Sequence, residues 1–216
     1  HVCHPATNLN SVTNSVKFDV LSTLDFEFSK GILFSDKGVR KYHGIGLVDG
    51  QLLTEHIEVA EEALQHCCKL ATIERHGKNG NISVCPLLGY GIVNGAVATS
   101  VAHDSHNVIC AGDNAKDMAT ACNRLREIGG GYVIASKGKV IDEFALPYFG
   151  LMSDKPVSEA IEGISRLERK AHELHVNPRI DPFTTLSFLA LPVIPDIRLL
   201  DTGLYDVTNG KFYRIE

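Results

Sequence analysis

The stretch AVATSVAHDSHNVICAG, residues 96–112, places five consecutive polar residues between two apolar runs. If Asp104 and Ser105 form a two-residue hairpin turn, His103 and His106 close the hairpin as a cross-strand pair, with their side chains on one face and about 5 Å apart. If residues 96–111 instead form one continuous strand, a separation of three residues places the two rings on opposite faces. Asp-Ser is a weaker turn signal than Asn-Gly, so the sequence leaves both geometries open.

Short extended segments dominate the part of the chain before this stretch. The Val, Phe and Leu positions predict a strand within residues 15–29, and glycines divide residues 37–57 into further strands. A short helix followed by a strand is predicted over residues 58–76. Residues 79–103 predict strands and tight turns, with Pro86 excluded from any central ladder because proline has no N–H to donate.

Helices are predicted after this stretch. Asp113 and Asn114 offer a cap for a helix over residues 115–128, which glycines 129–131 end. Its apolar stripe consists of Met118, Ala121, Cys122 and Leu125. Residues 132–146 predict a hairpin that turns at residues 136–139.

A second helix is predicted to begin at a cap from Ser153 or Asp154, with Pro156 in its first turn. Its apolar stripe consists of Ile161, Ile164, Leu167 and Ala171. Strands first and helices interleaved later indicate an α+β fold, a mostly antiparallel or mixed sheet covered by helices.

Composition excludes several classes of function. The 216 residues carry a net charge of −5, which offers no basic surface for nucleic acid. The longest apolar runs are far shorter than the ~20 residues that cross a bilayer, so we expect no membrane partner and a soluble, cytoplasmic protein. The six cysteines contain no C-x-x-C pair and are expected to be reduced and mostly buried. No phosphate-binding glycine loop is present.

Histidines and carboxylates suggest a metal site as one reading of the polar cluster. His103 and His106 could share a divalent metal if the hairpin forms, and Glu74 and His76 lie upstream at same-face strand spacing. Glu55 and His56 are lesser candidates. The alternative is structural: the two histidines fix a buried turn, with Asp104 and Asn107 capping backbone donors.

Three blocks carry a family resemblance. Residues 74–134, which begin ERHGKNGNISVCPLLGYG, the block LPYFGLMSDKP at 146–156 and the block DPFTTLSFLALPVIPDIRLLDTGLYDV at 181–207 resemble the C-terminal domain of bacterial-type adenine deaminase. The resemblance covers most of residues 15–210. We therefore expect residues 15–216 to form such a domain and residues 1–14 to be a linker or tail from an upstream domain. The absence of an initial methionine favours a piece of a longer chain.

The resemblance implies a role in a metal-dependent hydrolase that converts adenine and water to hypoxanthine and ammonia. Enzymes of this kind belong to the amidohydrolases of purine metabolism, and hold manganese or iron mainly in an upstream barrel, through an H-x-H pair and further ligands. This sequence contains no H-x-H and lacks the ~250 residues of a barrel, so we expect the chain alone to be inactive.

The resemblance also marks candidate site residues within the shared blocks. Those expected to face substrate are Glu74, Arg75, Asp104, Ser105, Asn107, Ser153 and Asp154, and those expected to bind metal are His76, His103 and His106. The expected partners are the upstream barrel, adenine and a second copy of the chain. Two alternatives remain open: a non-catalytic module for folding, oligomerisation or metal binding, and a self-sufficient metal hydrolase built on the three histidines.

Overall fold

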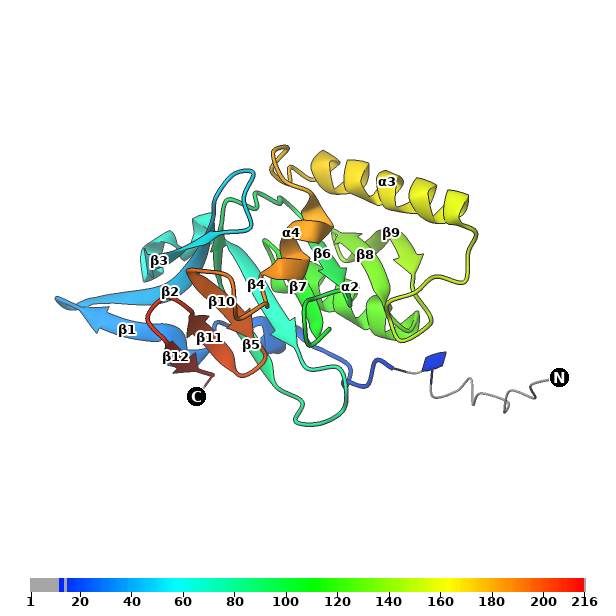
Figure 1. Ribbon diagram of the computed structural model, residues 1–216. Helices are drawn as coiled ribbons and strands as arrows, with labels where there is room; N and C mark the ends of the chain where they lie inside the picture. The colour runs from blue at the N-terminus through cyan, green and yellow to red at the C-terminus, as the bar shows by residue number, and fades with distance from the viewer. Residues whose placement is uncertain (1–11, 14, 216) are drawn as a thin grey trace.

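A nine-stranded mixed sheet forms the centre of the molecule (Figure 1). The computed structural model describes residues 12, 13 and 15–215, so almost all of the predicted tail at 1–14 lies outside the described residues. The strands of this sheet are β1 (Leu33–Asp36), β2 (Val39–Leu47), β3 (Thr54–Ala60), β4 (Cys68–Ile73), β5 (Ile82–Leu88), β6 (Ala96–Thr99), β7 (Val108–Gly112), β8 (Gly131–Ser136) and β9 (Lys139–Ala145). Their order is β1-β2-β5-β4-β7-β6-β8-β9, with β3 also paired to β2. Only β2 and β5 pair in parallel, which confirms the predicted mostly antiparallel or mixed sheet.

Helices and a second, three-stranded sheet cover this sheet. The helices are α2 (Ala115–Glu127), α3 (Val157–Glu173) and α4 (Pro182–Phe188), and the small sheet contains β10 (Ile197–Leu200), β11 (Gly203–Asp206) and β12 (Lys211–Arg214). Short 3-10 helices lie at η1 (Thr23–Phe26), η2 (Lys30–Ile32) and η3 (Glu61–His66). Figure 1 shows α2 behind the sheet and α4 with β10–β12 in front of it.

Each face of the sheet has its own core because neighbouring residues on a strand point to opposite faces. Leu70 belongs to the cluster that packs under α3, α4 and β10, whereas Ala71 belongs to the cluster under α2. In the same way, Ile134 belongs to the first of these clusters and Val133 to the second. The helices are therefore held on both sides by burial of apolar side chains, worth roughly 1.5–3 kcal/mol for each fully buried Leu or Ile.

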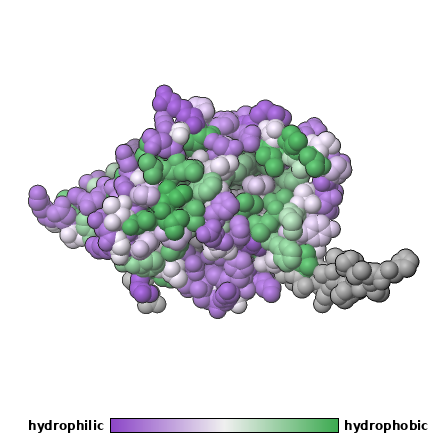
Figure 2. Space-filling view, viewed as in Figure 1, coloured by the Kyte–Doolittle hydropathy of each residue, from purple (hydrophilic) through white to green (hydrophobic). Residues whose placement is uncertain are grey.

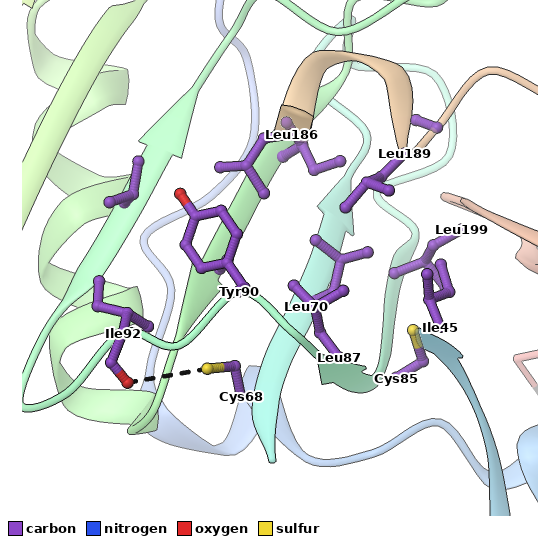
Figure 3. Packing of buried hydrophobic residues seen from close by; sticks show 14 of the residues in the cluster. Ile45, Cys68, Leu70, Cys85, Leu87, Tyr90, Ile92, Leu186, Leu189 and Leu199 are labelled. Atoms are coloured by element: carbon purple, nitrogen blue, oxygen red, sulfur yellow. Dashed lines mark hydrogen bonds between the residues drawn. The ribbon is translucent and has the colours of Figure 1, made fainter. Parts of the chain in front are cut away.

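The cluster in Figure 3 fixes the position of α4 against the sheet. Leu186 and Leu189 pack with Leu70 and Leu87 of the sheet and with Leu199 of β10. Tyr90 is fully buried, and its hydroxyl donates to the carbonyl of Pro182 at 3.1 Å. The start of α4 is thus fixed by a hydrogen bond, and the rest of the helix is held against the sheet by apolar packing.

Helix α2 matches its prediction closely. Asn114 is the N-cap, its side-chain oxygen accepts from the Asp117 N–H, and Met118, Ala121, Cys122 and Leu125 are all fully buried. Gly129 follows with φ of +79°, a conformation that favours glycine and ends the helix. The five described cysteines are free, as expected, and Cys3 lies outside the described residues.

Replacing Asn114 by alanine is expected to lower the free energy of unfolding by about 1 kcal/mol, because the Asp117 N–H loses its acceptor. Asn114→Ser is the matched control, since serine also caps helices and should retain most of the stability. Urea unfolding followed by circular dichroism measures both variants. Equal stabilities for Asn114→Ala and Asn114→Ser would contradict this account of the cap.

Two local predictions in the first half of the chain are wrong. The segment 15–29 contains no strand but the 3-10 helix η1, because Ser22 and Asp25 form a capping box there. Pro86 does lie within the central strand β5, opposite Lys69 of β4. The parallel pairing with β2 involves only Leu87 and Leu88 of β5, so β2 requires no N–H from the proline.

The start of α3 also differs from its prediction. Pro156 itself is the N-cap, and neither Ser153 nor Asp154 caps the helix, because the Ser153 hydroxyl instead accepts from the Lys155 N–H. Leu167 and Ala171 are buried as predicted, whereas Ile161 is 62% exposed. The first turns of α3 therefore extend beyond the apolar cluster that covers the sheet. No helix among the described residues is both long enough and apolar enough to span a bilayer.

Candidate functional site

The turn at residues 100–107 joins β6 to β7, which pair antiparallel in the register Thr99 to Ile109. Of the two geometries that the sequence leaves open, the antiparallel pair is the one observed, but the two-residue turn at Asp104 and Ser105 is wrong. The His106 N–H donates to the Ala102 carbonyl at 2.6 Å, so the chain closes over a wider turn. His103 and His106 nevertheless lie together, with ring centroids 5.7 Å apart and edge-to-face.

Arg75 fixes the backbone of this turn through hydrogen bonds. Arg75 is 2% exposed, and its guanidinium donates to the carbonyls of His106 and Phe149 and to the hydroxyl of Ser15. The last two bonds measure 2.9 Å to Phe149 and 3.0 Å to Ser15. Burial lowers the pKa of Arg75. Arg75 therefore joins three segments that are distant in sequence, and its donors are used by backbone and hydroxyl oxygens rather than left free for a ligand.

Glu74 organises the neighbouring loop at residues 76–81. Its carboxylate accepts backbone N–H groups from His76, Lys78, Asn79 and Gly80 at 2.5–3.4 Å. Burial raises the pKa of Glu74, but these four N–H donors outweigh that effect and hold it below its ordinary value. Glu74 is thus ionised, and it fixes the backbone of this loop.

Within the HDSHN stretch, residues 103–107, some side chains lie at the surface and others are buried. The His76 Nε2–H donates to the Ser105 carbonyl at 2.8 Å, the Ser105 hydroxyl accepts from the Asn107 N–H at 3.4 Å, and Asp104 is exposed. Asn107 is 3% exposed. Within the described part of the chain, Asn107 Oδ1 and His106 Nδ1 are buried without a hydrogen-bond partner. Burial, followed by the nearby His103 and Arg75, lowers the pKa of His106, so its ring is kept neutral.

Ser153 and Asp154 do not join this turn. The segment that precedes them does contact the turn, because the Ser100 hydroxyl donates to the Gly150 carbonyl at 2.6 Å. Asp154 is exposed, with the Lys155 ammonium 3.9 Å from its carboxylate.

The three candidate metal ligands do not gather around one point. Among residues 12, 13 and 15–215, no group of three or more His, Cys, Asp and Glu side chains has an arrangement that could hold a metal ion. His76, His103 and His106 therefore do not fit a bound manganese or iron, and we derive no chemical step through a metal in this chain.

A cavity of about 310 Å³ opens beside His103, between the turn, α3 and α4. The His103 backbone N–H donates to the Ser187 carbonyl at 2.8 Å, and its ring packs on Phe188 with centroids 4.8 Å apart. Phe183 and Tyr132 meet edge-to-face at 4.8 Å in the same lining. The polar lining includes the carboxyl groups of Glu168 and Asp181. This is the place where the HDSHN stretch meets a space that could receive a ligand or another polypeptide.

Glu168 and Asp181 are the two acidic residues of this lining. Burial, and then the negative charge of Asp181, raise the pKa of Glu168. Asp181 also caps α4 by accepting the N–H groups of Phe183 and Thr184. Sequence reasoning missed both acids, because one lies in the middle of α3 and the other thirteen positions further along the chain.

A second polar cluster joins the two sheets away from this cavity. His56 Nε2 lies 2.9 Å from His43 Nδ1, and His56 Nδ1 lies 3.5 Å from a carboxylate oxygen of Asp206. The His43 ring stacks on Phe34 at 4.3 Å and packs on Tyr213 at 4.1 Å. Burial and the neighbouring His56 lower the pKa of His43 to about 4. Of these residues, sequence reasoning named only His56, as a lesser metal candidate.

The fold and the cavity define an α+β domain in which a mixed sheet carries a histidine-containing turn beside an aromatic and acidic cavity. Residues 47–211 match the family model described as the adenine deaminase C-terminal domain. The chain belongs to this family, which confirms the predicted resemblance.

Three curated relatives are named adenine deaminase. The protein of Nitratidesulfovibrio vulgaris (strain DP4) is 46% identical over 177 residues, which are 78% of this chain and 31% of that protein. The protein of Brucella abortus (strain 2308) is 39% identical over 208 residues, 92% of this chain and 34% of that protein. The protein of Clostridium acetobutylicum is 47% identical over 145 residues, 67% of this chain and 25% of that protein. The chain thus spans about a third or less of the length of these relatives.

Proposed function

We propose that this chain serves as the C-terminal domain of an adenine deaminase, a hydrolase that converts adenine and water to hypoxanthine and ammonia. The observation that carries the proposal is the family match over residues 47–211, together with relatives named adenine deaminase that are about three times longer. In this proposal the chain is inactive alone and acts beside a metal-bearing domain that precedes it.

The proposal assigns the metal, manganese or iron, to that preceding domain. Support comes from the described residues, in which no group of three or more possible ligands is arranged for a metal. The bound metal would activate the attacking water. The residues of this chain would act by shape: Arg75 fixes the turn at residues 100–107, and the turn holds His103 against Phe188 at the edge of the cavity. We propose that this edge faces the preceding domain.

Replacing His103 by alanine in the longer polypeptide that the proposal requires is expected to lower kcat/KM for adenine at least tenfold, since the ring that supports Phe188 is lost. The matched control is His66→Ala, because His66 is exposed and is not among the residues lining this cavity. Release of ammonia from adenine is the measurement. Equal activity for the two variants would contradict the proposed orientation. No deamination of adenine by the longer polypeptide itself would contradict the proposed function.

A further inference from the structure

Four large apolar side chains lie exposed on the turn that follows β9 and on the first turns of α3. Phe149 is 45% exposed, Met152 52%, Val157 75% and Ile161 62%. Val157 and Ile161 are four residues apart in one helix and therefore share a face. Figure 2 shows apolar side chains over α3 and again below it, towards the point where the described chain begins. These four residues are called the α3 patch below.

The backbone holds Phe149 in a fixed position at the surface. Its φ of +58° lies in the left-handed region, which bulky residues rarely adopt. The Phe149 N–H donates to the Val12 carbonyl at 2.7 Å, and its carbonyl accepts from Arg75 at 2.9 Å. The Tyr148 N–H also donates to the Met152 carbonyl at 3.2 Å. A constrained turn therefore presents the ring, so little conformational entropy is lost when a partner covers it.

The same face of α3 leads from the patch to the cavity beside His103. Ile164 follows Ile161 by three residues in the helix, and it lines this cavity together with His103. The patch and the edge of the cavity thus form one continuous surface along α3. This edge is the one that we propose to face the preceding domain.

The polypeptide enters the domain beside this patch. Val12 accepts the Phe149 N–H, and Figure 1 shows the chain entering next to the turn between β9 and α3. Eleven residues precede Val12 in this sequence. Because eleven residues span at most ~40 Å when fully extended, a domain attached before them is held within reach of the patch.

The size of the patch favours a partner on the same polypeptide over a free one. A stable complex of separate proteins buries about 800 Å² on each partner, an area that four partly exposed side chains do not provide on their own. A tethered partner needs less area, because attachment through a short linker gives an effective concentration in the millimolar range. Relatives of this chain carry about two thirds of their length outside the matched region. The matching family is described as a C-terminal domain, which indicates that this length precedes it.

We propose that the α3 patch is the surface on which the preceding part of the longer polypeptide docks, through apolar side chains that cover Phe149, Met152, Val157 and Ile161. The identity of the occupant rests on the proposed function, whereas the exposure of the patch and the constraint on Phe149 do not.

Oxidation of Met152 by hydrogen peroxide, followed by mass spectrometry of peptides, measures whether the patch is covered. The chain contains one other methionine, Met118, which is fully buried and serves as the internal reference. We expect Met152 to be oxidised at least tenfold more slowly in the longer polypeptide than in the 216-residue chain. Equal rates in the two would overturn the proposal. Oxidation that slows with increasing concentration of the 216-residue chain would also overturn it, because a second copy would then cover the patch.

A substitution in the longer polypeptide tests whether the patch itself carries the docking. Ile161→Asp places a charge in the proposed interface, where it has no partner, so oxidation of Met152 should rise to the rate in the 216-residue chain. Val39→Asp is the matched control. Val39 is 40% exposed at the turn between β1 and β2, at the far end of the molecule in Figure 1, and its replacement should leave Met152 protected. Protection that survives Ile161→Asp would contradict the assigned surface.

These experiments measure coverage of the patch and not deamination, so the two proposals fail separately. A longer polypeptide that protects Met152 without deaminating adenine would refute the proposed function and retain the docking of the preceding part on this surface. A longer polypeptide that deaminates adenine while Met152 stays fully reactive would refute the docking surface alone.

Discussion

Replacing Arg75 by methionine is expected to lower the free energy of unfolding by about 4 kcal/mol. Methionine fills the space of the aliphatic stem, but it leaves the carbonyls of His106 and Phe149 without their charged donor. Hydrogen bonds to a charged group contribute roughly 1.5–3 kcal/mol each, and buried acceptors left without a donor add a penalty. Because Arg75 is 2% exposed, water cannot replace the lost donor without opening the turn.

The matched control for Arg75 is Arg40→Met. Arg40 pairs with Glu61 at 3.3 Å on the surface, with 56% of its side chain exposed, and should change stability by less than about 1 kcal/mol. Urea unfolding of the two variants gives the comparison. If Arg75→Met lost no more stability than Arg40→Met, the description of Arg75 as the anchor of the HDSHN turn would be wrong.

Acidification from pH 7 to pH 4 is expected to destabilise the protein through His43. Its pKa is lowered from 6.5 to about 4 in the folded state, by burial and by His56. The unfolded chain therefore binds this proton at higher pH than the folded chain. The contribution of neutral His43 is fully present above about pH 6.5 and is lost as the pH falls towards 4. One pKa unit corresponds to about 1.4 kcal/mol, so the loss is at most about 3 kcal/mol.

Several side chains pack around His43 or act on its charge. They are Phe34, His56, Glu58, Asp206, Lys211 and Tyr213. Asp206 also contributes to acid sensitivity, but in a lower pH range. Burial raises its pKa, yet hydrogen bonds from Asn209 and the nearby His56 outweigh this and hold it below its ordinary 3.8.

His43→Phe retains the stacked ring and removes the titrating group. Its stability should fall less than that of the unmodified chain between pH 6.5 and 4, whereas His66→Phe on the surface should follow the unmodified chain. Thermal unfolding at a series of pH values measures the difference. Identical pH profiles for His43→Phe and the unmodified chain would contradict the role assigned to His43.

Helix α2 and the hairpin β8–β9 could be predicted from the sequence because their determinants are local. The cap, the apolar stripe and the terminating glycine of α2 lie within 16 residues, and each acts where the sequence places it. The hairpin turns at residues 136–139 as predicted. Such elements need no information from distant parts of the chain.

The candidate site depends on contacts between distant segments, and the sequence therefore predicted only its outline. The proximity of His103 and His106 was one of two geometries that the sequence left open, and the wider turn depends on Arg75, which also reaches Ser15 and Phe149. Glu168 and Asp181 line one cavity because α3 packs beside α4. His43 and His56 become neighbours through the register of β2 with β3, in which His43 is opposite Glu58 and Ile45 is opposite His56. No spacing rule within one segment could have identified these pairs.

Glu74 and Arg75 show how a family resemblance can identify important residues without their roles. Both lie in the shared ERH block, and both were expected to face substrate. In the structure Glu74 accepts four backbone N–H groups and Arg75 donates to backbone carbonyls, so each builds the site rather than lines it. The residue of the HDSHN stretch that lines the cavity is His103, at its start.

The most direct test of the central claim is a deaminase assay on the purified 216-residue chain with added manganese or iron, compared with the same chain joined to the preceding domain that we propose. The account predicts no loss of adenine with the chain alone, and production of hypoxanthine and ammonia by the joined polypeptide. Turnover of adenine by the 216-residue chain, abolished by His103→Ala or His106→Ala, would contradict the account and make the HDSHN turn itself the catalytic centre.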